Sequence, residues 1–187
     1  MQPNTTDSSQ LQDINAAFVA GKISRDEARS AVIEVIFNRL HCSRVSLWRF
    51  DGEPGALSLL CFASKATGGE LDTRTRRLTA VEYRDYFNEL VNTGMYVCVD
   101  AFADPKLEPM RETHLLPNRV LSTLDAVFMV NGRAYGMVCC EQTDAMRSWQ
   151  ATEVAAVRSI VSKLALLMAG SDDPALWGSP SVPMAPL

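Results

Sequence analysis

The residues that could perform covalent or metal chemistry are few and scattered along this sequence. It has two histidines and five cysteines, and the cysteines are Cys42, Cys61, Cys98, Cys139 and Cys140. None forms a Cys-x-x-Cys pair, and three or four fall within predicted strands, where a thiol in apolar surroundings is inert. Neither histidine, His41 or His114, shows the ligand spacing of a zinc site. The pattern indicates reduced, buried thiols of a cytoplasmic protein and predicts no metal centre.

Asp125 is the polar residue with the most unusual surroundings, because it stands inside the apolar run 121–130. Burying a carboxylate costs free energy unless hydrogen bonds or charges compensate it. Two interpretations stay open: a hydrogen-bonded structural residue near a strand end, or a polar group that points into a pocket. His114 leaves a similar choice between a surface or lid histidine and a pocket group.

Three arginines, Arg74, Arg76 and Arg77, cluster at the end of the polar segment 66–77, which also contains Gly68 and Gly69. A solvated loop is the simpler interpretation of this composition. The alternative is an anion site, because guanidinium groups bind carboxylate and phosphate groups.

The overall composition is that of an ordinary globular domain. The chain has 187 residues, of which 47% are hydrophobic, and a formal net charge of −4. The length predicts one domain over 25–170, between a tail with a short helix (1–24) and a Pro-rich tail (171–187). The negative charge and the lack of a basic patch argue against a nucleic-acid partner. No signal peptide precedes the domain, and no apolar run approaches the roughly 18 residues of a membrane span.

A long hairpin must position Asp125. Asn131-Gly132 separates the apolar runs 121–130 and 133–141, and this dipeptide favours a type I′ hairpin turn. We expect the turn to place Phe128 opposite Tyr135. One face would then carry Thr123, Asp125, Val127 and Met129 together with Ala134, Gly136, Val138 and Cys140. Both faces are mostly apolar, which predicts that the hairpin lies in the middle of a sheet.

Capping motifs and apolar spacing predict the other elements. Ser24 and Glu27 form a capping box before a helix over 25–41, and Thr79 and Glu82 form a second box before a helix to about residue 92. Strands are predicted at 45–50, 56–64 and 96–99, a short helix around 110–116, and a long helix over 149–168. A short helix over 11–20 follows residues 1–9, which are polar and expected to be disordered.

The long helix has two apolar stripes, and such a helix needs two neighbours. The first stripe consists of Val154, Val157, Val161, Leu164 and Met168, and the second contains Ala156, Ile160 and Leu167. One neighbour should be the sheet. The other is either the N-terminal helix or a second copy of the chain.

With these elements in this order, the sequence resembles a GAF domain, a small-molecule-binding regulatory module of bacterial signalling proteins. The stretches that carry the likeness are 44–51, the turn V-D-A-F-A-D-P at 99–105, the hairpin segments 122–127, 131–132 and 135–141, and the helix entry with Arg147, Ser148, Trp149 and Glu153. The turn is similar to the "V-x-D-A-x-x-D-P" stretch of bacterial members. The likeness extends over about residues 27–169 and is specific for the fold but poor for the ligand.

The resemblance implies an α+β fold with a central antiparallel sheet of five to six strands. The N- and C-terminal helices would cover one face, and a helix and loop lid would close a pocket over the other. The implied pocket residues are Phe87, Phe102, His114, Asp125, Val127 and Met129. The family often pairs its first and last helices into a dimer, which here would use Val32, Val35, Val154, Val157, Val161, Leu164 and Met168.

Known subfamilies fit poorly. The stretch Thr113-His114-Leu115 resembles the "C-H-L" stretch of bilin-binding members, but a threonine stands where their thioether-forming cysteine would be. The signature of the cyclic-nucleotide-binding members is missing. The members that reduce free methionine sulfoxide use reactive loop cysteines, whereas these cysteines read as core residues.

We therefore expect a non-enzymatic sensor that binds an unidentified small molecule or a protein partner. The first alternative is a homodimerisation or interaction module with a vestigial pocket, and the second is a cysteine-based redox enzyme of the sulfoxide reductase type. The sequence shows no nucleophile–base pair and no phosphate loop. It also shows no output domain, so the chain would act in trans on another signalling protein or belong to a larger sensor. The cofactor remains unknown from sequence.

Overall fold

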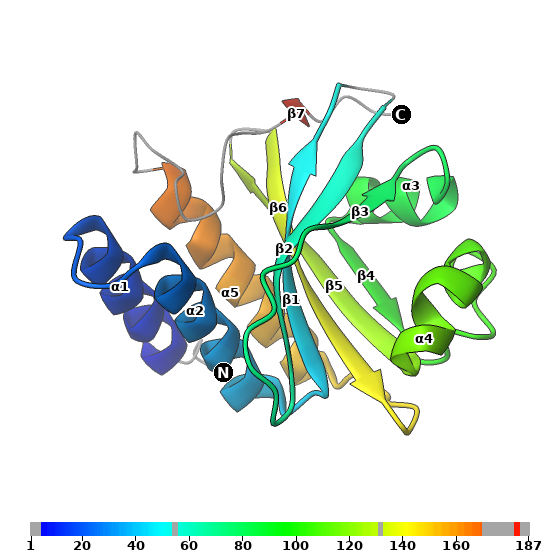
Figure 1. Cartoon of the computed structure of the whole chain (residues 1–187), viewed down its shortest axis with the longest axis horizontal. Helices are drawn as coiled ribbons and strands as arrows, with labels where there is room; N and C mark the ends of the chain where they lie inside the picture. Colours follow the sequence, from blue (N-terminus) through cyan, green and yellow to red (C-terminus); the bar gives the residue numbers. More distant parts are fainter. Residues whose placement is uncertain (1–4, 54–55, 131–132, 170–181, 184–187) are drawn as a thin grey trace.

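The computed structural model describes residues 5–53, 56–130, 133–169 and 182–183. Its centre is an antiparallel sheet with the strand order β3-β2-β1-β6-β5-β4 (Figure 1). The strands are β1 (Arg44–Asp51), β2 (Ser58–Ala66), β3 (Arg76–Thr79), β4 (Met95–Cys98), β5 (Val120–Val130) and β6 (Arg133–Thr143), and a two-residue strand, β7 (Val182–Pro183), pairs with β6. The predicted α+β fold and antiparallel sheet are confirmed.

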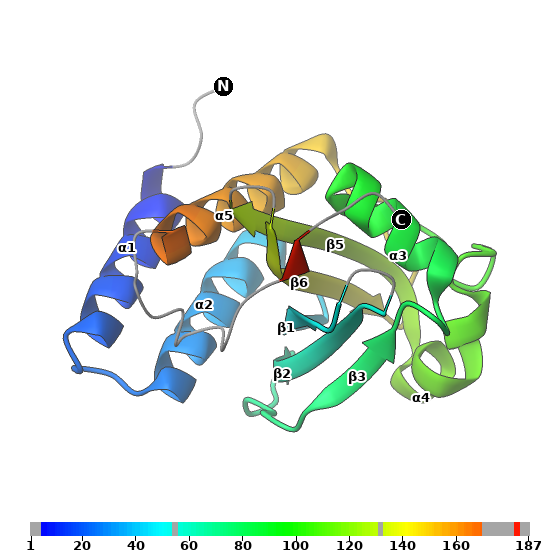
Figure 2. The ribbon, with the colours of Figure 1, turned by 90° about the horizontal axis from the view of Figure 1, so that it is seen from above.

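Helices cover both faces of the sheet. The helices α1 (Thr5–Val19), α2 (Arg25–Leu40) and α5 (Ala151–Ala169) lie on one face, and α3 (Arg84–Thr93) and α4 (Leu116–Asn118) lie on the other (Figures 1 and 2). A 3₁₀ turn (Glu108–Met110) and a π-helical turn (Arg111–Leu115) lead directly into α4. Each face has its own cluster of buried hydrophobic residues. The N- and C-terminal helices therefore share a face, as expected, and the helix and loop lid lies opposite.

The hairpin of β5 and β6 is central, as predicted, because β1 and β4 flank it on either side. Its register differs from the expected one. A bulge at Phe128/Met129 places Phe128 opposite Gly136 instead of Tyr135, and Asp125 opposite Cys139. The turn at Asn131-Gly132 lies outside the described residues.

This bulge moves the β6 side chains to other faces than those expected. A one-residue shift reverses which face every following side chain occupies. Val138 and Cys140 accordingly lie in the helix-side cluster with Leu124, Ala126 and Phe128. Met137 and Cys139 lie in the lid-side cluster with Val127. The lid-facing side of β6 therefore carries Met137, Cys139 and Glu141.

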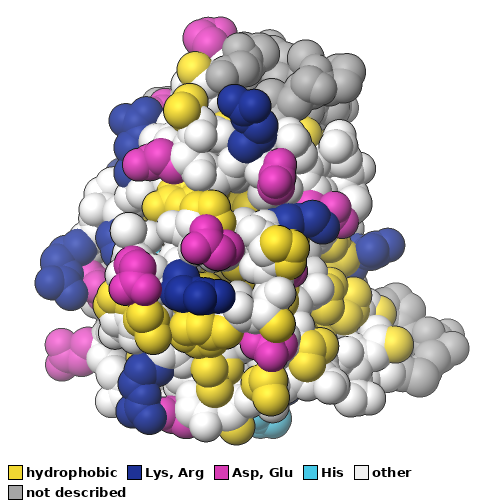
Figure 3. All heavy atoms as spheres, turned by 90° about the vertical axis from the view of Figure 1, so that its right-hand side faces the viewer, with side chains coloured by type: hydrophobic (Ala, Val, Ile, Leu, Met, Phe, Trp, Pro, Cys, Tyr) yellow, Lys and Arg dark blue, Asp and Glu magenta, His cyan; other side chains and the backbone are white. Residues whose placement is uncertain are grey.

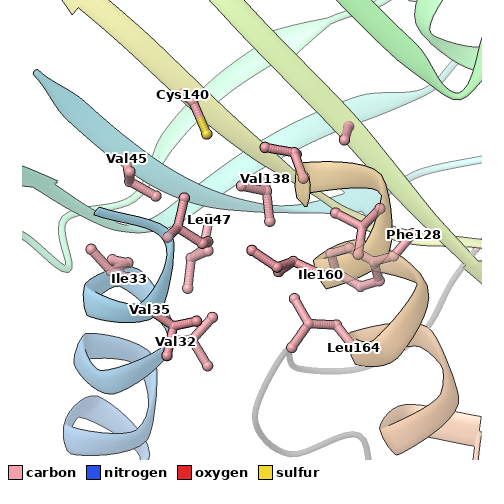
Figure 4. Packing of buried hydrophobic residues seen from close by; sticks show 14 of the residues in the cluster. Val32, Ile33, Val35, Val45, Leu47, Phe128, Val138, Cys140, Ile160 and Leu164 are labelled. Atoms are coloured by element: carbon pink, nitrogen blue, oxygen red, sulfur yellow. The ribbon is translucent and has the colours of Figure 1, made fainter. Parts of the chain in front are cut away.

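The helix α5 has both of its expected neighbours within one chain. Its residues Ile160 and Leu164 face the sheet beside α2, where Val32 and Val35 meet Leu47 and Val138 (Figure 4). The helix α1 contacts both α2 and α5, and its Leu11 is only 1% exposed. The sequence left two alternatives for the second neighbour of this helix, the N-terminal helix or a second copy of the chain. The structure has the N-terminal helix in this place.

Most of the residues expected at a dimer surface lie inside the core of one chain. Val157 is fully buried, and Val32, Val35, Val161 and Leu164 are each no more than 6% exposed. Val154 is partly buried against the same cluster, and the side chain of Met168 lies outside the described part of the chain. The apolar spacing of these helices is thus explained by packing within a single chain, and a dimer through them stays a prediction.

The entry to α5 joins three parts of the chain around Arg147. Its guanidinium donates to the backbone oxygens of Leu40 (2.5 Å) and His41 (3.1 Å), at the end of α2, and lies 4.7 Å from the centre of the Trp149 ring. The Trp149 indole donates to the Cys98 backbone oxygen at the end of β4 (3.2 Å). This junction fixes α2, β4 and α5 relative to one another.

Local motifs explain where several elements begin. The predicted capping box forms, since Ser24 Oγ accepts from Glu27 N and the Glu27 carboxylate accepts from Ser24 N. The second box closes only a turn between Thr79 and Glu82, and α3 begins later, at Arg84. The helix α1 begins at Thr5, within the segment expected to be disordered.

The region before α3 and the C-terminal tail complete the description of the chain. The strand β3 was expected to be loop, and most of the Pro-rich tail lies outside the described residues. Among the helices that the structure describes, none combines the length and the apolar character of a membrane span.

Candidate functional site

A buried polar cluster lies between the central strands and the lid, with Asp125 of β5 at its centre. Asp125 is 2% exposed. Its carboxylate accepts hydrogen bonds from Tyr86 Oη (2.8 Å) on α3 and from Thr123 Oγ1 (2.8 Å) two residues earlier on the same strand. Burial favours the neutral acid and raises the pKa of Asp125 to about 6, although these hydrogen bonds favour the charged form. Burial likewise raises the pKa of Tyr86, and the charge of Asp125 adds to that effect.

A second buried acid, Glu141 of β6, joins the lid to the sheet. Its Oε1 lies 2.5 Å from Nε2 of His114 in the lid, and its Oε2 accepts from Nη1 of Arg44 on β1 (3.2 Å). Burial disfavours the charged forms of both His114 and Glu141, but their mutual attraction outweighs it. The pKa of His114 is raised and that of Glu141 is lowered, with Arg44 contributing to the latter. Each charged group therefore favours the charged form of the other.

Side chain to backbone contacts hold the lid in place. Asp100 and Asp104 accept backbone N–H groups in the turn that begins the lid, and Asp104 also accepts from Tyr96 Oη (2.7 Å). Arg111 donates to the Phe102 backbone oxygen (2.7 Å), and the Asn118 amide donates to that of His114 (2.8 Å). Three apolar lid residues, Leu107, Met110 and Leu115, are buried against the sheet.

The space enclosed between lid and sheet is small. A cavity of about 30 Å³ is lined by Trp48, Leu78, Tyr86, Leu107, Met110, His114, Leu115, Val120, Thr123, Asp125, Met137, Cys139 and Glu141. It has room for about two or three water molecules, since each needs roughly 10–15 Å³. On the outer surface over α3 and α4, hydrophobic side chains alternate with charged ones (Figure 3). In this conformation the lid's own side chains fill most of the space beneath it.

The six residues expected to form the pocket occupy different places. His114 and Asp125 line the cavity. Phe87 and Val127 are buried in the surrounding apolar cluster, and Phe102 is half-buried in the lid with the Arg111 guanidinium 5.8 Å from its ring centre. Met129 is 42% exposed, because it lies beyond the bulge at the outer end of β5.

Four residues of the polar cluster were missed from sequence: Tyr86, Thr123, Arg44 and Glu141. No spacing in the sequence connects Tyr86 with Asp125, which is 39 residues away. Glu141 was not predicted, because the register expected from the sequence did not include the bulge that changes the pairing of β6 with β5. The alternation of Met137, Cys139 and Glu141 puts these three side chains on one face of β6, but only the bulge places that face on the side of Asp125.

The cysteines give this site no reactive thiolate. All five are buried and free. Burial raises the pKa of Cys61 to about 11 and that of Cys98 to about 12, and it also raises the pKa of Cys139. For Cys140, the neighbouring Cys42 and burial both raise the pKa. Over the described ranges, no group of three or more His, Cys, Asp or Glu side chains is arranged to hold a metal ion.

Several solved structures that share this fold come from photoreceptors. The blue-light absorbing form of the Thermosynechococcus elongatus PixJ GAF domain is 20% identical, with a TM-score of 0.63 over 86% of this chain and 87% of that one. The phycocyanobilin-bound GAF domain from a cyanobacterial phytochrome is 18% identical, with a TM-score of 0.67 over 90% and 96%. The photosensory core module of the Stigmatella aurantiaca phytochrome is 15% identical, with a TM-score of 0.65 over 88% of this chain and 35% of that one.

At these identities the structural likeness shows the fold alone. A search of curated proteins finds no match. A search against protein families matches one family, described as "GAF domain", over residues 24–168. This segment contains the capping box of α2, the entire sheet path from β1 to β6, the lid and nearly all of α5. Because the match extends over more than half of the sequence, the chain belongs to the GAF domain family.

Proposed function

We propose that this GAF domain is a non-enzymatic sensor that binds a small molecule non-covalently beneath its lid and passes the change to a signalling partner. The observation that carries the proposal is the group of ionisable side chains, Asp125, Glu141, His114 and Tyr86, gathered around a cavity in an otherwise apolar layer. Burying such groups costs stability, and each group left without a partner costs about 1–3 kcal/mol. Perturbed acids that line an internal cavity mark candidate binding sites.

Ligand entry requires the lid to move. Pockets for small molecules usually measure about 300–1,000 Å³, far more than the cavity of about 30 Å³ described above. The segment from the 3₁₀ turn to α4 is the part that can open, because its contacts with the sheet are a few apolar side chains and the His114–Glu141 pair. Opening the lid therefore requires the contact between His114 and Glu141 to break.

The lining indicates the kind of ligand. Trp48, Leu107, Met110 and Met137 offer apolar and aromatic surface, while the carboxylates of Asp125 and Glu141 accept hydrogen bonds. We expect a largely apolar molecule with hydrogen-bond donors, a class that includes the bilins bound by structural neighbours such as the phycocyanobilin-bound GAF domain. Thr113 would leave any such ligand without a thioether bond at this position.

Native mass spectrometry of the chain incubated with phycocyanobilin, and separately with a cell metabolite extract, tests this proposal. We expect the wild type to show the mass of a ligand complex. Asp125→Asn should bind the same ligand with an affinity at least about tenfold lower, because it loses one charged hydrogen-bond partner. Asp85→Asn, a change of the same kind at an exposed position of α3, is the matched control. No bound species from either source, or equal retention by both variants, would refute a ligand at this site.

The second candidate is an interaction module whose pocket no longer binds a ligand. The small cavity favours it, as do the bonds from Tyr86 and Thr123 that already satisfy Asp125. Such a module would act through its surface, as a homodimer or on another protein in trans. Hydrogen exchange separates the two candidates, because a sensor lid must exchange its amides faster than the strands beneath it, whereas a vestigial lid would be protected with them. The five reduced thiols support a cytoplasmic location for either candidate.

A further inference from the structure

A second hollow lies on the outer side of the His114–Glu141 pair. It is an open cleft of about 560 Å³ between the ends of β1 and β2, the segment that leads into β3, and α4. Its lining consists of Arg44, Ser64, Ala66, Asp72, Arg74, Thr75, Arg76 and Asn118. None of these described residues also lines the cavity beneath the lid. Hydrogen bonds from Arg44 to Glu141 and from Asn118 to His114 join the two spaces.

The cleft carries more positive than negative charge. Three guanidinium groups line it against one carboxylate, that of Asp72. Arg74 is fully engaged with that carboxylate, since its Nε and Nη2 donate to the two Asp72 oxygens at 3.0 and 3.1 Å. Arg44 is engaged on one side only, through Nη1 to Glu141. The third guanidinium, that of Arg76, makes no hydrogen bond to a carboxylate within the described residues.

The surroundings of Arg76 leave part of its hydrogen-bonding capacity unused. Its Nη2 donates to the Cys61 sulfur at 3.6 Å, and a thiol is a weak acceptor. Its Nε is buried and makes no hydrogen bond in the part of the chain that the structure describes. A buried donor without an acceptor costs about 1–3 kcal/mol, so an acceptor that reached this guanidinium would relieve a cost that the fold already carries.

We propose that this cleft binds an oxyanion group, a phosphate or a carboxylate, of a small-molecule ligand between Arg44, Arg76 and the Asn118 side chain. The planar guanidinium matches such a group with two parallel hydrogen bonds. Arg44 can turn its free nitrogens to the cleft while Nη1 stays on Glu141. This site does not depend on the cavity beneath the lid, so it stands or falls separately from the sensor function proposed above.

The position of the cleft links the anion to the lid. Arg44 bonds Glu141, the acid that pairs with His114, and the Asn118 side chain donates to the His114 backbone oxygen. An anion in the cleft would therefore lie against the two side chains that bond the His114–Glu141 pair from the outer side.

The test is a titration of the full chain with inorganic phosphate, with acetate, and with chloride at matched ionic strength, followed by the NMR signals of the arginine Nε–H groups. We expect saturable shifts of the Arg76 and Arg44 signals with phosphate or acetate and none with chloride. The order of the two affinities tells whether phosphate or carboxylate is the preferred group. Arg76→Gln should weaken binding about tenfold or more, the loss of a charge-assisted hydrogen bond.

Arg77→Gln is the matched control. Arg77 is the next residue of β3, so its side chain lies on the opposite face, where Nε and Nη2 donate to Ser58 Oγ (3.1 and 2.7 Å). Both variants remove one positive charge from the same strand. Equal weakening by the two, equal shifts with chloride, or the lack of saturable shifts in the wild type would overturn the proposal. If Arg76→Gln does not fold, Arg76→Lys and Asn118→Ala replace it, and binding that neither variant weakens would overturn the proposal as well.

Discussion

Two carboxylates in one layer of this GAF domain are held in opposite ways by their neighbours. Glu141 faces two cationic groups, so its pKa is lowered despite burial. Asp125 has only neutral donors, so burial prevails and its pKa is raised to about 6. The site therefore contains one acid that stays charged and one that takes up a proton in the mildly acidic range.

Asp125→Asn should remove a pH dependence of stability. Because the folded pKa of Asp125 lies above its unfolded value, the folded state binds this proton more tightly, and the resulting stability is lost as the pH rises through about 6. The free energy of unfolding of the wild type, measured relative to the variant, should be about 1–2 kcal/mol larger at pH 5 than at pH 8. Urea unfolding across this range measures it.

His114 and Glu141 are present in both proteins, so their titration cancels in the difference. Asp85→Asn, at an exposed position, should show no such slope. A difference between wild type and Asp125→Asn that stays constant from pH 5 to pH 8 would mean that Asp125 is ionised throughout.

At the scale of the elements, the helices on one face of the sheet are parts of a single core. Val157 of α5 is fully buried among residues of the sheet and α2. Introducing a carboxylate there leaves an unpaired charge in an apolar layer.

Val157→Glu should therefore unfold the domain or lower its free energy of unfolding by more than about 3 kcal/mol, among the largest effects of single substitutions. Ala155→Glu, at an exposed position of the same helix, should change it by less than about 0.5 kcal/mol. Circular dichroism during urea unfolding separates the two outcomes. A folded Val157→Glu protein that has merely lost a dimer would contradict the burial of this helix face.

The sequence was most informative where local chemistry decides the structure. The Ser24–Glu27 capping box, the Asp100 and Asp104 turn and the apolar runs of β5 and β6 each reveal their element within a few residues. The bulge at Phe128/Met129 was not predictable, because it depends on how the hairpin packs between two layers. The strand β3 has only four residues and two arginines, and its pairing with β2 gives it its conformation.

The candidate site was predictable only in part for the same reason. Asp125 stood out as a carboxylate within an apolar strand, and the family resemblance pointed to His114. Their partners come from α3, β1 and β6, so the cluster depends on the tertiary arrangement. The small cavity is a property of how the lid side chains pack, and no spacing in the sequence reports it.

At the scale of the whole molecule, α1 covers the outer side of the layer formed by α2 and α5 (Figure 2). Its attachment depends on Leu11, which is fully enclosed, on the partly buried Ile14 and Phe18, and on an ion pair between Asp7 and Arg39 (3.6 Å). If a second copy associates through this layer, it must take the place of α1.

Leu11→Asp should release α1 and produce a dimer that forms with increasing concentration, because the apolar surface under α1 would then be exposed. Sedimentation velocity over a range of concentrations measures this. Val19→Asp is the control, because Val19 is 69% exposed on the same helix. A Leu11→Asp protein that stays monomeric at every concentration would show that α1 only stabilises its own chain.

The wall of the cavity includes Trp48, whose indole is 3% exposed and donates to Ser46 Oγ (2.8 Å). Trp149 belongs to the other layer of the core, and Trp177 lies outside the described residues, so replacing both with Phe would leave Trp48 as the single tryptophan. Indole emission shifts to longer wavelengths when water reaches the ring, so Trp48 is an intrinsic fluorophore at the place where the lid would admit solvent or solute. The protein thus carries its own optical reporter of the state of its interior, and no attached label is needed to observe it.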